Sequence, residues 1–342
     1  MIKKYFKYVG IIILSYILLC LITPFNKTLR NRSIKNQINY LSHILDDGYD
    51  DKLQSRFPEG KLFSNSLLAL STIEFCDKNK LANTKYANIV DKCIGRIESD
   101  RALSVFDTNL VPKYGAFYQG WSNLVYSTYA KSKLLEYSNI SSVVALKAEA
   151  FETLIDSIQT DSLRIIETYT ESNWPADNLI AIMSIGNKSL QSQWIDLLLK
   201  TSDHESGLIN HSGSQRSIVR GSSTAMMTYC LNKSGYGDIE GYNDKFEEIF
   251  IDSYFGIQLV KENQDGSNIM DVDSGPVVFG YGASATIMNI KAQASLGKSS
   301  SRITWGAMNL ISLPINIFRR KYLILKKEPM LDLFMLWAST EL

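Results

Sequence analysis

Two carboxylates in the last third of the chain have the spacing and setting of catalytic groups. Asp271 and Asp273 lie two positions apart before Gly275 and Pro276, and a run of small and apolar residues that includes Tyr281 follows. Burying an unpaired carboxylate costs several kcal/mol or shifts its pKa, so acids beside a closely packed helix need a partner or a task. The pair therefore predicts general acid/base chemistry, or alternatively a helix cap with an Asx turn.

Three other loops supply aromatic, amide and cationic groups next to expected helix starts. They cover residues 107–121, 171–178 and 211–223. Such groups suit a polyhydroxylated ligand, because carboxylates act as acid, base or nucleophile on glycosidic bonds. The candidate catalytic residues are Asp177, Asp271 and Asp273. The candidate ligand-binding residues are Tyr114, Tyr118, Gln119, Trp121, Trp174, Asn178, Arg216, Arg220 and Tyr281.

Several of these candidates also have a purely structural explanation. Asp177 lies just inside a helix start, where the macrodipole favours an acid, and Trp174 before a proline suits a hydrophobic staple. Arg216 and Arg220 share a helix face, and a buried arginine needs an acidic partner. The tyrosines of the first loop share a face that is typical of core packing. For these residues, a functional role and a purely structural role therefore both stay open.

Helical periodicity extends over almost the whole chain and predicts an all-α fold. The expected helices are residues 33–45, 61–78, 83–98, 115–137, 142–161, 175–185, 189–200, 215–232, 242–254, 276–296, 301–318 and 328–339. Helices rich in small residues alternate with amphipathic ones that carry Lys and Glu on one side. Small-residue helices pack on all sides, so the alternation predicts an inner and an outer ring, an (α/α)6-type toroid, with an α-solenoid as the alternative. Short β-hairpins near residues 207–210 and 255–260 are expected over the mouth of the ring.

The helix start Tyr114-Gly-Ala-Phe-Tyr-Gln-Gly-Trp121, together with the alternating hairpins, resembles the (α/α)-toroid, six-hairpin glycosidase-like superfamily. Its Tyr-x-x-x-x-Gln-Gly part is similar to the helical domain of uronate C5-epimerases. The resemblance covers residues 60–320 in architecture and a few residues in motif. It implies a toroid that hosts hydrolase, lyase, epimerase or dehydratase chemistry, or binding without catalysis.

A nearly uncharged run rich in Ile and Leu occupies residues 8–25. It is as long as the shortest helix that spans a bilayer, and residues 21–25 offer no small-x-small cleavage site, so we expect an uncleaved signal anchor. Basic residues lie on both sides of the run, and the short N-terminal tail favours an N-in orientation with an extracytoplasmic toroid. The expected division is a tail at 1–7, the anchor at 8–25, a juxtamembrane segment with the first helix at 26–59 and the toroid at 60–342.

The composition of the chain restricts the kinds of partner and cofactor that we expect. The formal net charge of +1 argues against a general nucleic-acid surface. The four cysteines lack metal-ligand spacing, and His204 and His211 have few acidic neighbours, so we expect no metal and no cofactor; a calcium site through Asp265, Asp271 and Asp273 is the alternative. The expected partners are a lipid bilayer, through residues 8–25, and a small-molecule or oligosaccharide ligand. The oligomeric state stays open.

Three functions fit these observations. The first is a membrane-anchored enzyme that acts on a saccharide or a similar polyhydroxylated envelope component, as a hydrolase, lyase or epimerase. The second is an isoprenoid-processing cyclase or dehydratase, because Asp271-Val-Asp273-Ser274 is similar to the Asp-x-Asp-Asp/Thr acid motif of class II terpene cyclases, with Ser274 in the last place. The third is a non-catalytic anchored binding module. A cavity wall of Phe and Trp favours the second function, and a polar open groove favours the first.

Overall fold

The computed structural model describes residues 2–213, 218–271, 274–323 and 329–342. Helices account for 65% of the chain, and strands occur in the described residues as three antiparallel two-stranded hairpins. The predicted all-α class is therefore confirmed. Arg216 and Asp273, two of the candidate site residues, lie outside the described residues.

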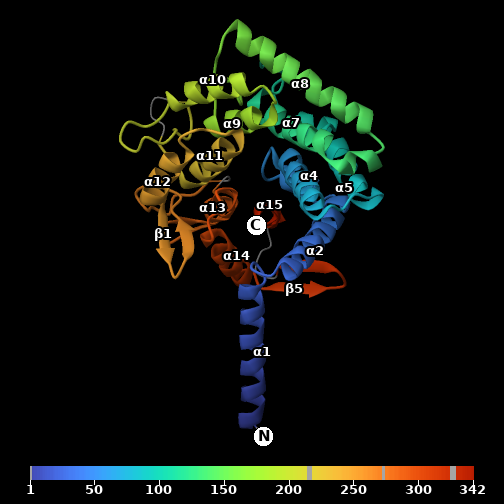
Figure 1. The fold of residues 1–342 in the computed structure, drawn as a ribbon, viewed down its shortest axis with the longest axis vertical. Helices are drawn as coiled ribbons and strands as arrows, with labels where there is room; N and C mark the ends of the chain where they lie inside the picture. The colour runs from blue at the N-terminus through green and yellow to red at the C-terminus, as the bar shows by residue number, and fades with distance from the viewer. Residues whose placement is uncertain (1, 214–217, 272–273, 324–328) are drawn as a thin grey trace.

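Within these ranges, six helices that are buried on nearly every side form an inner layer (Figure 1). They are α4 (Gly60–Asn79), α7 (Gly115–Lys131), α9 (Pro175–Ser184), α11 (Gly221–Ser234), α13 (Ala283–Ser295) and α15 (Pro329–Glu341). Each packs against the next in this order, and α15 packs against α4, so that the contacts return to their start. Small residues permit the close approach: a Cβ on Gly120 of α7 would lie 3.1 Å from the backbone nitrogen of Ala181 on α9.

A second set of helices covers the inner layer. They are α2 (Lys27–Asp46), α5 (Thr84–Ile97), α8 (Ser141–Asp161), α10 (Lys188–Leu199), α12 (Ile239–Phe250) and α14 (Ser300–Ile311). Helix α2 packs on α15 and α4. Each of the others packs mainly on one inner helix: α5 on α4, α8 on α7, α10 on α9, α12 on α11 and α14 on α13. Helix α5 shows the reason, because its buried Tyr86, Val90, Cys93 and Ile97 recur at spacings of three and four residues and form one apolar face.

Short elements complete the described chain. The helical ones are α3 (Tyr49–Gln54), α6 (Asp100–Leu103) and the 3-10 helix η1 (Lys133–Tyr137). The hairpins are β1 (Ile251–Tyr254) with β2 (Ile257–Val260), β3 (Val277–Val278) with β4 (Tyr281–Gly282), and β5 (Pro314–Ile317) with β6 (Arg320–Leu323). The strand expected near 255–260 is thus present as β2. Near 207–210 the described chain has a single bridge, between Ser202 and Ile209.

Four predicted helix boundaries differ from the structure because strands take up the helix ends. The helices predicted to begin at residues 215 and 276 begin at Gly221 and Ala283, since Arg220 forms a β-bridge with Asn263 and residues 277–282 form a hairpin. The helices predicted to reach residues 254 and 318 end at 250 and 311 and continue as β1 and β5. Local hairpins at three of these ends, and the bridge to Asn263 at the fourth, supply the backbone hydrogen bonds in place of helical ones.

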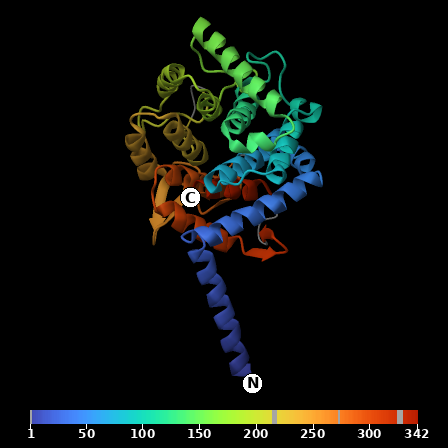
Figure 2. The ribbon, with the colours of Figure 1, turned by 45° about the vertical axis from the view of Figure 1, so that its right-hand side comes forward.

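Helix α1 (Ile2–Ile22) projects away from the other helices, as Figures 1 and 2 both show. Its apolar side chains are exposed, for example Ile12 at 67% and Leu14 at 58%. Its C-terminal end packs on α14, and the Tyr16 hydroxyl donates to the Pro314 carbonyl at 3.1 Å. In the described residues no helix alone has the length and apolarity of a membrane span; Tyr8–Ile22 and Lys27–Asp46, which meet at a 93° bend, reach them as a pair.

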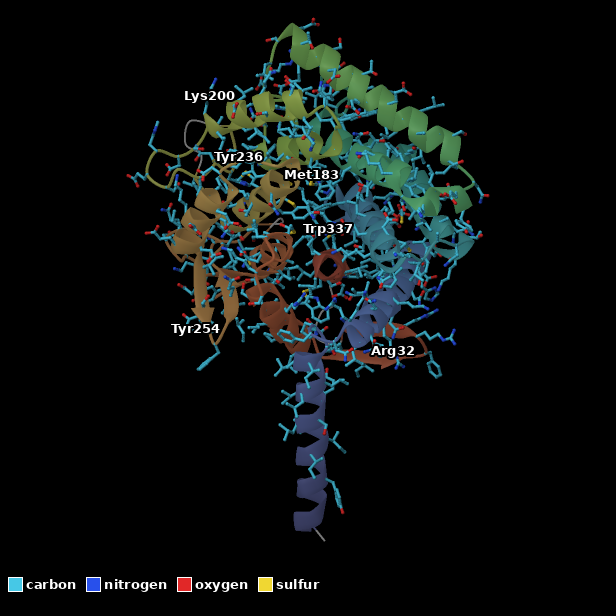
Figure 3. The ribbon with its side chains drawn as sticks, viewed as in Figure 1. Arg32, Met183, Lys200, Tyr236, Tyr254 and Trp337 are labelled. Carbon is cyan, nitrogen blue, oxygen red and sulfur yellow. The ribbon has the colours of Figure 1, made fainter. Side chains whose placement is uncertain are left out.

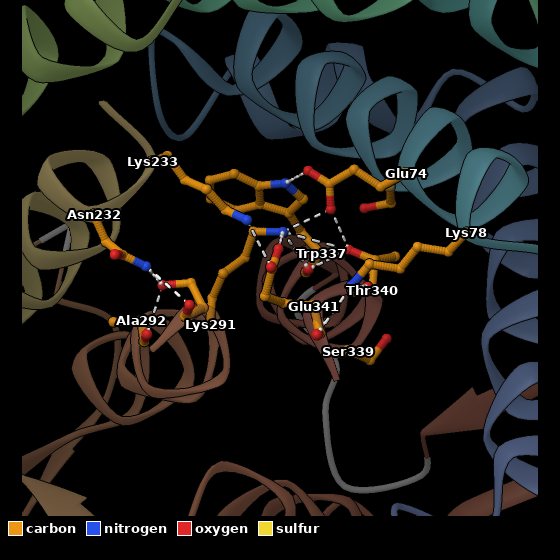
Figure 4. A network of polar contacts seen from close by, with 12 residues as sticks. Glu74, Lys78, Asn232, Lys233, Lys291, Ala292, Trp337, Ser339, Thr340 and Glu341 are labelled. Atoms are coloured by element: carbon orange, nitrogen blue, oxygen red, sulfur yellow. Dashed lines mark hydrogen bonds and ion pairs between the residues drawn. The ribbon is translucent and has the colours of Figure 1, made fainter. Parts of the chain in front are cut away.

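Toward the C-terminal ends of the inner helices, a buried ion-pair network joins four of them (Figure 4). The side chain of Lys291 on α13 is fully buried, and its Nζ lies 2.7 Å from Glu74 Oε2 of α4 and 3.6 Å from Glu341 Oε2 of α15. The same ammonium group lies 4.4 Å from the ring centroid of Trp337 on α15 and 5.0 Å from that of Tyr229 on α11. The network thus fixes these helices relative to one another.

Candidate functional site

The inner helices enclose a cavity of about 580 Å³ near their N-terminal ends. Its floor consists of one buried apolar side chain from each inner helix, within the helix's first two turns. These floor residues are Phe63, Trp121, Ile180, Met226, Met288 and Phe334. Aromatic rings dominate the contacts, because Phe63 lies 4.7 Å from Trp121 and 5.1 Å from Phe334 between ring centroids. The floor offers a ligand dispersion and π contacts but no charged group.

Except for the buried Ser284 of α13, the polar side chains of the cavity lie at its rim. The rim residues are Arg56, Glu59, Tyr169, Trp174, Asp177, His211, Ser222 and Ser223, and each is at least partly exposed. They come from the segments that lead into α4, α9 and α11, or from the first turns of α9 and α11. The cavity is therefore apolar inside and polar where it meets solvent.

Two carboxylates on the rim are held by hydroxyl groups. The Tyr169 hydroxyl donates to Glu59 Oε1, and the Thr168 hydroxyl donates to Asp177 Oδ2 at 3.0 Å. The Tyr169 ring stands at 86° to that of Trp174, with centroids 5.4 Å apart. This aromatic pair lies beside both acids, so a ligand on the rim would meet a ring face and two carboxyl groups together.

The segment before α9 is pinned in place by Asn178. Its side chain accepts a hydrogen bond from the Ile166 backbone nitrogen at 2.9 Å and donates to the Ile166 carbonyl at 3.0 Å. Asn178 is fully buried and does not line the cavity. Its amide therefore orients the loop that carries Tyr169 rather than facing a ligand.

A charged cluster around Arg220, buried except for the half-exposed Asp271, adjoins the rim. The Arg220 guanidinium donates to both oxygens of Asp271, at 2.5 and 3.0 Å, and to Glu262 Oε1 at 2.7 Å. Glu262 is fully buried, and the Ser222 hydroxyl also donates to its Oε1. Burial alone lowers the pKa of Arg220, but Asp271 and Glu262 outweigh it and raise that pKa. Burial raises the pKa of Glu262, with Arg220 and Ser222 opposing.

His211 links this cluster to the cavity. Burial and then the nearby Arg220 lower the pKa of His211 to about 4, against the effect of Asp271, so the imidazole is neutral at neutral pH. A guanidinium has no acceptor, so Arg220 Nη1 must donate to Nε2 of His211 at 3.2 Å, and the ring proton is on Nδ1. Nδ1 then donates to the Ser223 hydroxyl oxygen at 2.6 Å. His211 therefore makes Ser223 a hydrogen-bond donor toward the cavity and does not act as its base.

Two glycines make room for the cluster. A Cβ on Gly221 would lie 1.9 Å from the Lys261 carbonyl oxygen, and a Cβ on Gly282 would lie 2.6 Å from Glu262 Oε2. The Gly221 backbone nitrogen donates to the Glu262 carbonyl at 2.9 Å. The start of α11 can therefore approach the segment 261–262 closely only without a side chain.

The structure brings three of the predicted site residues together at the cavity, namely Trp121, Trp174 and Asp177. Asp271 and Arg220 bind each other beside it. Tyr114 and Tyr118 pack on one another with ring centroids 5.2 Å apart, and burial raises the pKa of Tyr118 to about 12. Gln119 donates to the Lys113 carbonyl, and Tyr281 donates to Asp252.

Sequence reasoning missed Glu59, Tyr169 and Glu262 as site residues. Glu59 directly precedes Gly60, the first residue of the inner helix α4. The four predicted site loops also lead into inner helices, so the position of Glu59 in the sequence could have identified it as a site residue. Glu262 has no comparable local signal, because its partner Arg220 lies 42 positions away. In the described part of the chain, no group of three or more His, Cys, Asp or Glu side chains is placed to hold a metal ion.

Comparison with protein-family models found no match, and neither did comparison with curated proteins.

Proposed function

We propose that this chain is an (α/α)6-toroid enzyme that acts on a largely apolar, hydroxyl-bearing molecule of isoprenoid type. The composition of the cavity carries this assignment: every inner helix contributes an apolar floor residue, and the charged groups lie at the rim. A hydrocarbon skeleton gains free energy by leaving water for such a floor, at roughly 25 cal/mol per Å² buried. Its polar group would stay at the rim beside Glu59 and Asp177.

The reaction class we propose is acid/base removal or migration of a hydroxyl group. One rim carboxyl group would protonate the hydroxyl so that it leaves as water, and the other carboxylate would take a proton from the neighbouring carbon to give an alkene. Trp121, Phe63 and Phe334 would stabilise positive charge that develops on the skeleton through their ring faces. The Ser223 hydroxyl would orient the substrate oxygen.

A saccharide substrate is the second candidate, and one observation favours it. Tyr169 and Trp174 form an aromatic pair beside two carboxylates on the exposed rim, where a sugar ring could lie without filling the floor. An enzyme of this kind would bind soluble oligosaccharides, whereas the first candidate would bind isoprenoid alcohols.

Farnesol and a soluble oligosaccharide serve as probes for a test on the full chain in nanodiscs. We expect farnesol to change the tryptophan emission, because Trp121 and Trp174 line the cavity. Trp121→Phe should remove most of that change, whereas Trp194→Phe, on α10 away from the cavity, should not. If farnesol leaves the emission unchanged and the oligosaccharide alters it, the saccharide assignment replaces ours.

Turnover tests the two carboxylates separately from binding. Glu59→Gln and Asp177→Asn should each slow conversion of farnesol by about 10²- to 10⁴-fold, the usual contribution of a general acid or base, and retain binding. Glu136→Gln, an exposed change in η1, is the matched control. Wild-type rates in either rim variant would exclude that residue from the chemistry.

We also propose that α1 anchors the protein in a bilayer, with the N-terminus inside and the toroid outside the cytoplasm. The exposed apolar side chains of α1 support the anchor. The four cysteines of the chain are all buried, so a cysteine introduced at Ser55 would report the orientation through a membrane-impermeant maleimide. Labelling in intact cells is expected; labelling only after lysis would reverse the orientation.

A further inference from the structure

Charge is distributed very unevenly along this chain despite its net value of +1. The first acidic residue is Asp46, and no acidic residue occurs between Asp273 and Glu328. These two acid-free stretches include α1, most of α2, the β3–β4 hairpin, α13, α14 and the β5–β6 hairpin. Basic residues in them have no acidic neighbour in sequence. Of these elements, α1, α14 and the β5–β6 hairpin lie at one end of the molecule together with the start of α2 (Figure 1).

The tertiary structure gathers these basic residues around the base of α1. Arg30 donates to the Pro24 carbonyl just after α1, and repulsion from Arg302 on α14 adds to the effect of burial in lowering the pKa of Arg30. Burial, followed by repulsion from Lys35 and Arg319, likewise lowers the pKa of Lys85. The set is Lys27, Arg30, Arg32, Lys35, Arg302, Arg319 and Arg320, and within the described residues none of them forms an ion pair with a carboxylate.

Exposed aromatic side chains lie at the same end. Phe255, in the β1–β2 turn, is 101% exposed, and Phe318, in the β5–β6 turn, is 93% exposed. In Figures 1 and 2 these hairpins flank the base of α1 at the level where that helix leaves the other helices. Figure 3 places Tyr254 and Arg32 at this level too. A single exposed aromatic is ordinary, but the turns that carry Phe255 and Phe318 flank the exposed apolar surface of α1, and apolar side chains that gather on one face mark an interaction surface.

We propose that this face, hereafter the basal face, docks on the surface of an anionic lipid bilayer. It consists of the β1–β2 and β5–β6 turns and the basic set around α1. Aromatic rings favour the bilayer interface, and clustered Lys and Arg bind anionic headgroups. The apolar surface of α1 leaves from the middle of the face, which fits a bilayer and not a nucleic acid. With α1 crossing the bilayer, the ring of inner helices in Figure 1 stands with one edge toward the membrane.

The test uses the full chain in nanodiscs and an environment-sensitive fluorophore on a single introduced cysteine. The probe sites are Phe255→Cys and Phe318→Cys, with Leu146→Cys on the distant helix α8 as the matched control and Leu18→Cys reporting α1. Nitroxide-labelled lipid should quench residues 255 and 318 in nanodiscs that contain phosphatidylglycerol, and should leave residue 146 bright. High salt should weaken this quenching, because it screens the basic set.

Charge reversal identifies the headgroup interaction. Arg319→Glu with Arg320→Glu should lower the docked-to-undocked ratio by about fivefold for each basic residue removed, whereas Lys188→Glu with Lys200→Glu, at the two ends of α10, should not change it. Lysine at both arginine positions should restore docking. The proposal is overturned if residues 255 and 318 are quenched no more than residue 146, whether or not residue 18 is quenched, or if quenching is equal in neutral and anionic nanodiscs.

Discussion

At the scale of single residues, the site depends on which groups carry protons. Arg220 can only donate, and this fixes the His211 tautomer and makes Ser223 a donor toward the cavity. A Ser–His pair of this polarity cannot generate a nucleophile, so the proposed acid/base steps are assigned to Glu59 and Asp177. Hydroxyl groups of Tyr169 and Thr168 hold these two acids in place at the rim.

His211 gives a pH dependence with a definite sign. Its pKa is about 4 in the folded protein, against 6.5 for an unperturbed histidine. Between these values the unfolded chain binds a proton that the folded chain does not, so stability is complete above pH 6.5 and falls as the pH falls, by about 3 kcal/mol at pH 4. Glu262, with its raised pKa, offsets part of this loss.

Urea denaturation at neutral pH and near pH 4, for the wild type and His211→Gln, measures this contribution. We expect the glutamine variant to lose clearly less stability on acidification, because Glu262 and the other acids are common to both proteins. Equal losses would show that His211 is protonated in the folded state and would remove the tautomer assignment.

At the scale of elements, the positions of the helix starts control the site. The start of α11 sets Arg220 and Ser222 against Glu262 and Ser223 against His211, and it can do so because Gly221 has no side chain. The start of α9 sets Trp174 and Asp177 on the rim, and Asn178 locks the preceding loop. Displacing either start would separate groups that must meet within hydrogen-bond distance.

Gly221→Ala tests the close approach of α11. The new Cβ would lie 1.9 Å from the Lys261 carbonyl oxygen, so the backbone must move, and we expect a loss of about 1–3 kcal/mol in the free energy of unfolding. Gly95→Ala in α5 is the control, because its Cβ would meet open space and alanine favours a helix by about 1 kcal/mol. Similar stability changes in the two variants would contradict the steric explanation.

At the scale of the whole molecule, the inner helices are fixed beneath the cavity by one buried cation. Lys291 faces Glu74 and Glu341 and is covered by the rings of Tyr229 and Trp337. Removing one partner from such a network leaves buried charge without compensation. The network therefore holds the floor in place, since Trp337 also contacts Trp121 with ring centroids 5.6 Å apart.

Lys291→Met should lower the free energy of unfolding by about 3–5 kcal/mol, because Glu74 would lose its paired cation, whereas Glu341 would keep Lys233 at 2.7 Å. Lys298→Met, just beyond α13, removes a partly exposed pair with Glu247 and should cost less than about 1 kcal/mol. Thermal or urea unfolding compares the two variants directly. If the Lys291 variant were as stable as the Lys298 variant, apolar packing without the ion pairs would hold the C-terminal ends of the inner helices together.

Local residue patterns predict the helical class and many helix boundaries. Asn83 and Asn187 cap α5 and α10 through their own side chains, and Pro175 occupies the first turn of α9, so these starts depend on neighbours a few positions away. The spacing of apolar residues in each helix likewise predicts which of its faces is buried. Trp121, Trp174 and Asp177 could be predicted at a common site because each stands in or near the start of a helix of one kind.

Packing in three dimensions selects which groups meet. Tyr169 reaches Glu59 across 110 positions and Lys291 reaches Glu74 across 217, and no local pattern encodes either pairing. The same holds for the bridge between Arg220 and Asn263 before α11. The other three boundaries differ because hairpins between neighbouring segments take residues that the helical period had assigned to a helix. Local residue patterns fix a helix and its buried face, but the free energy of a charge pair or a strand depends on what packing places beside it.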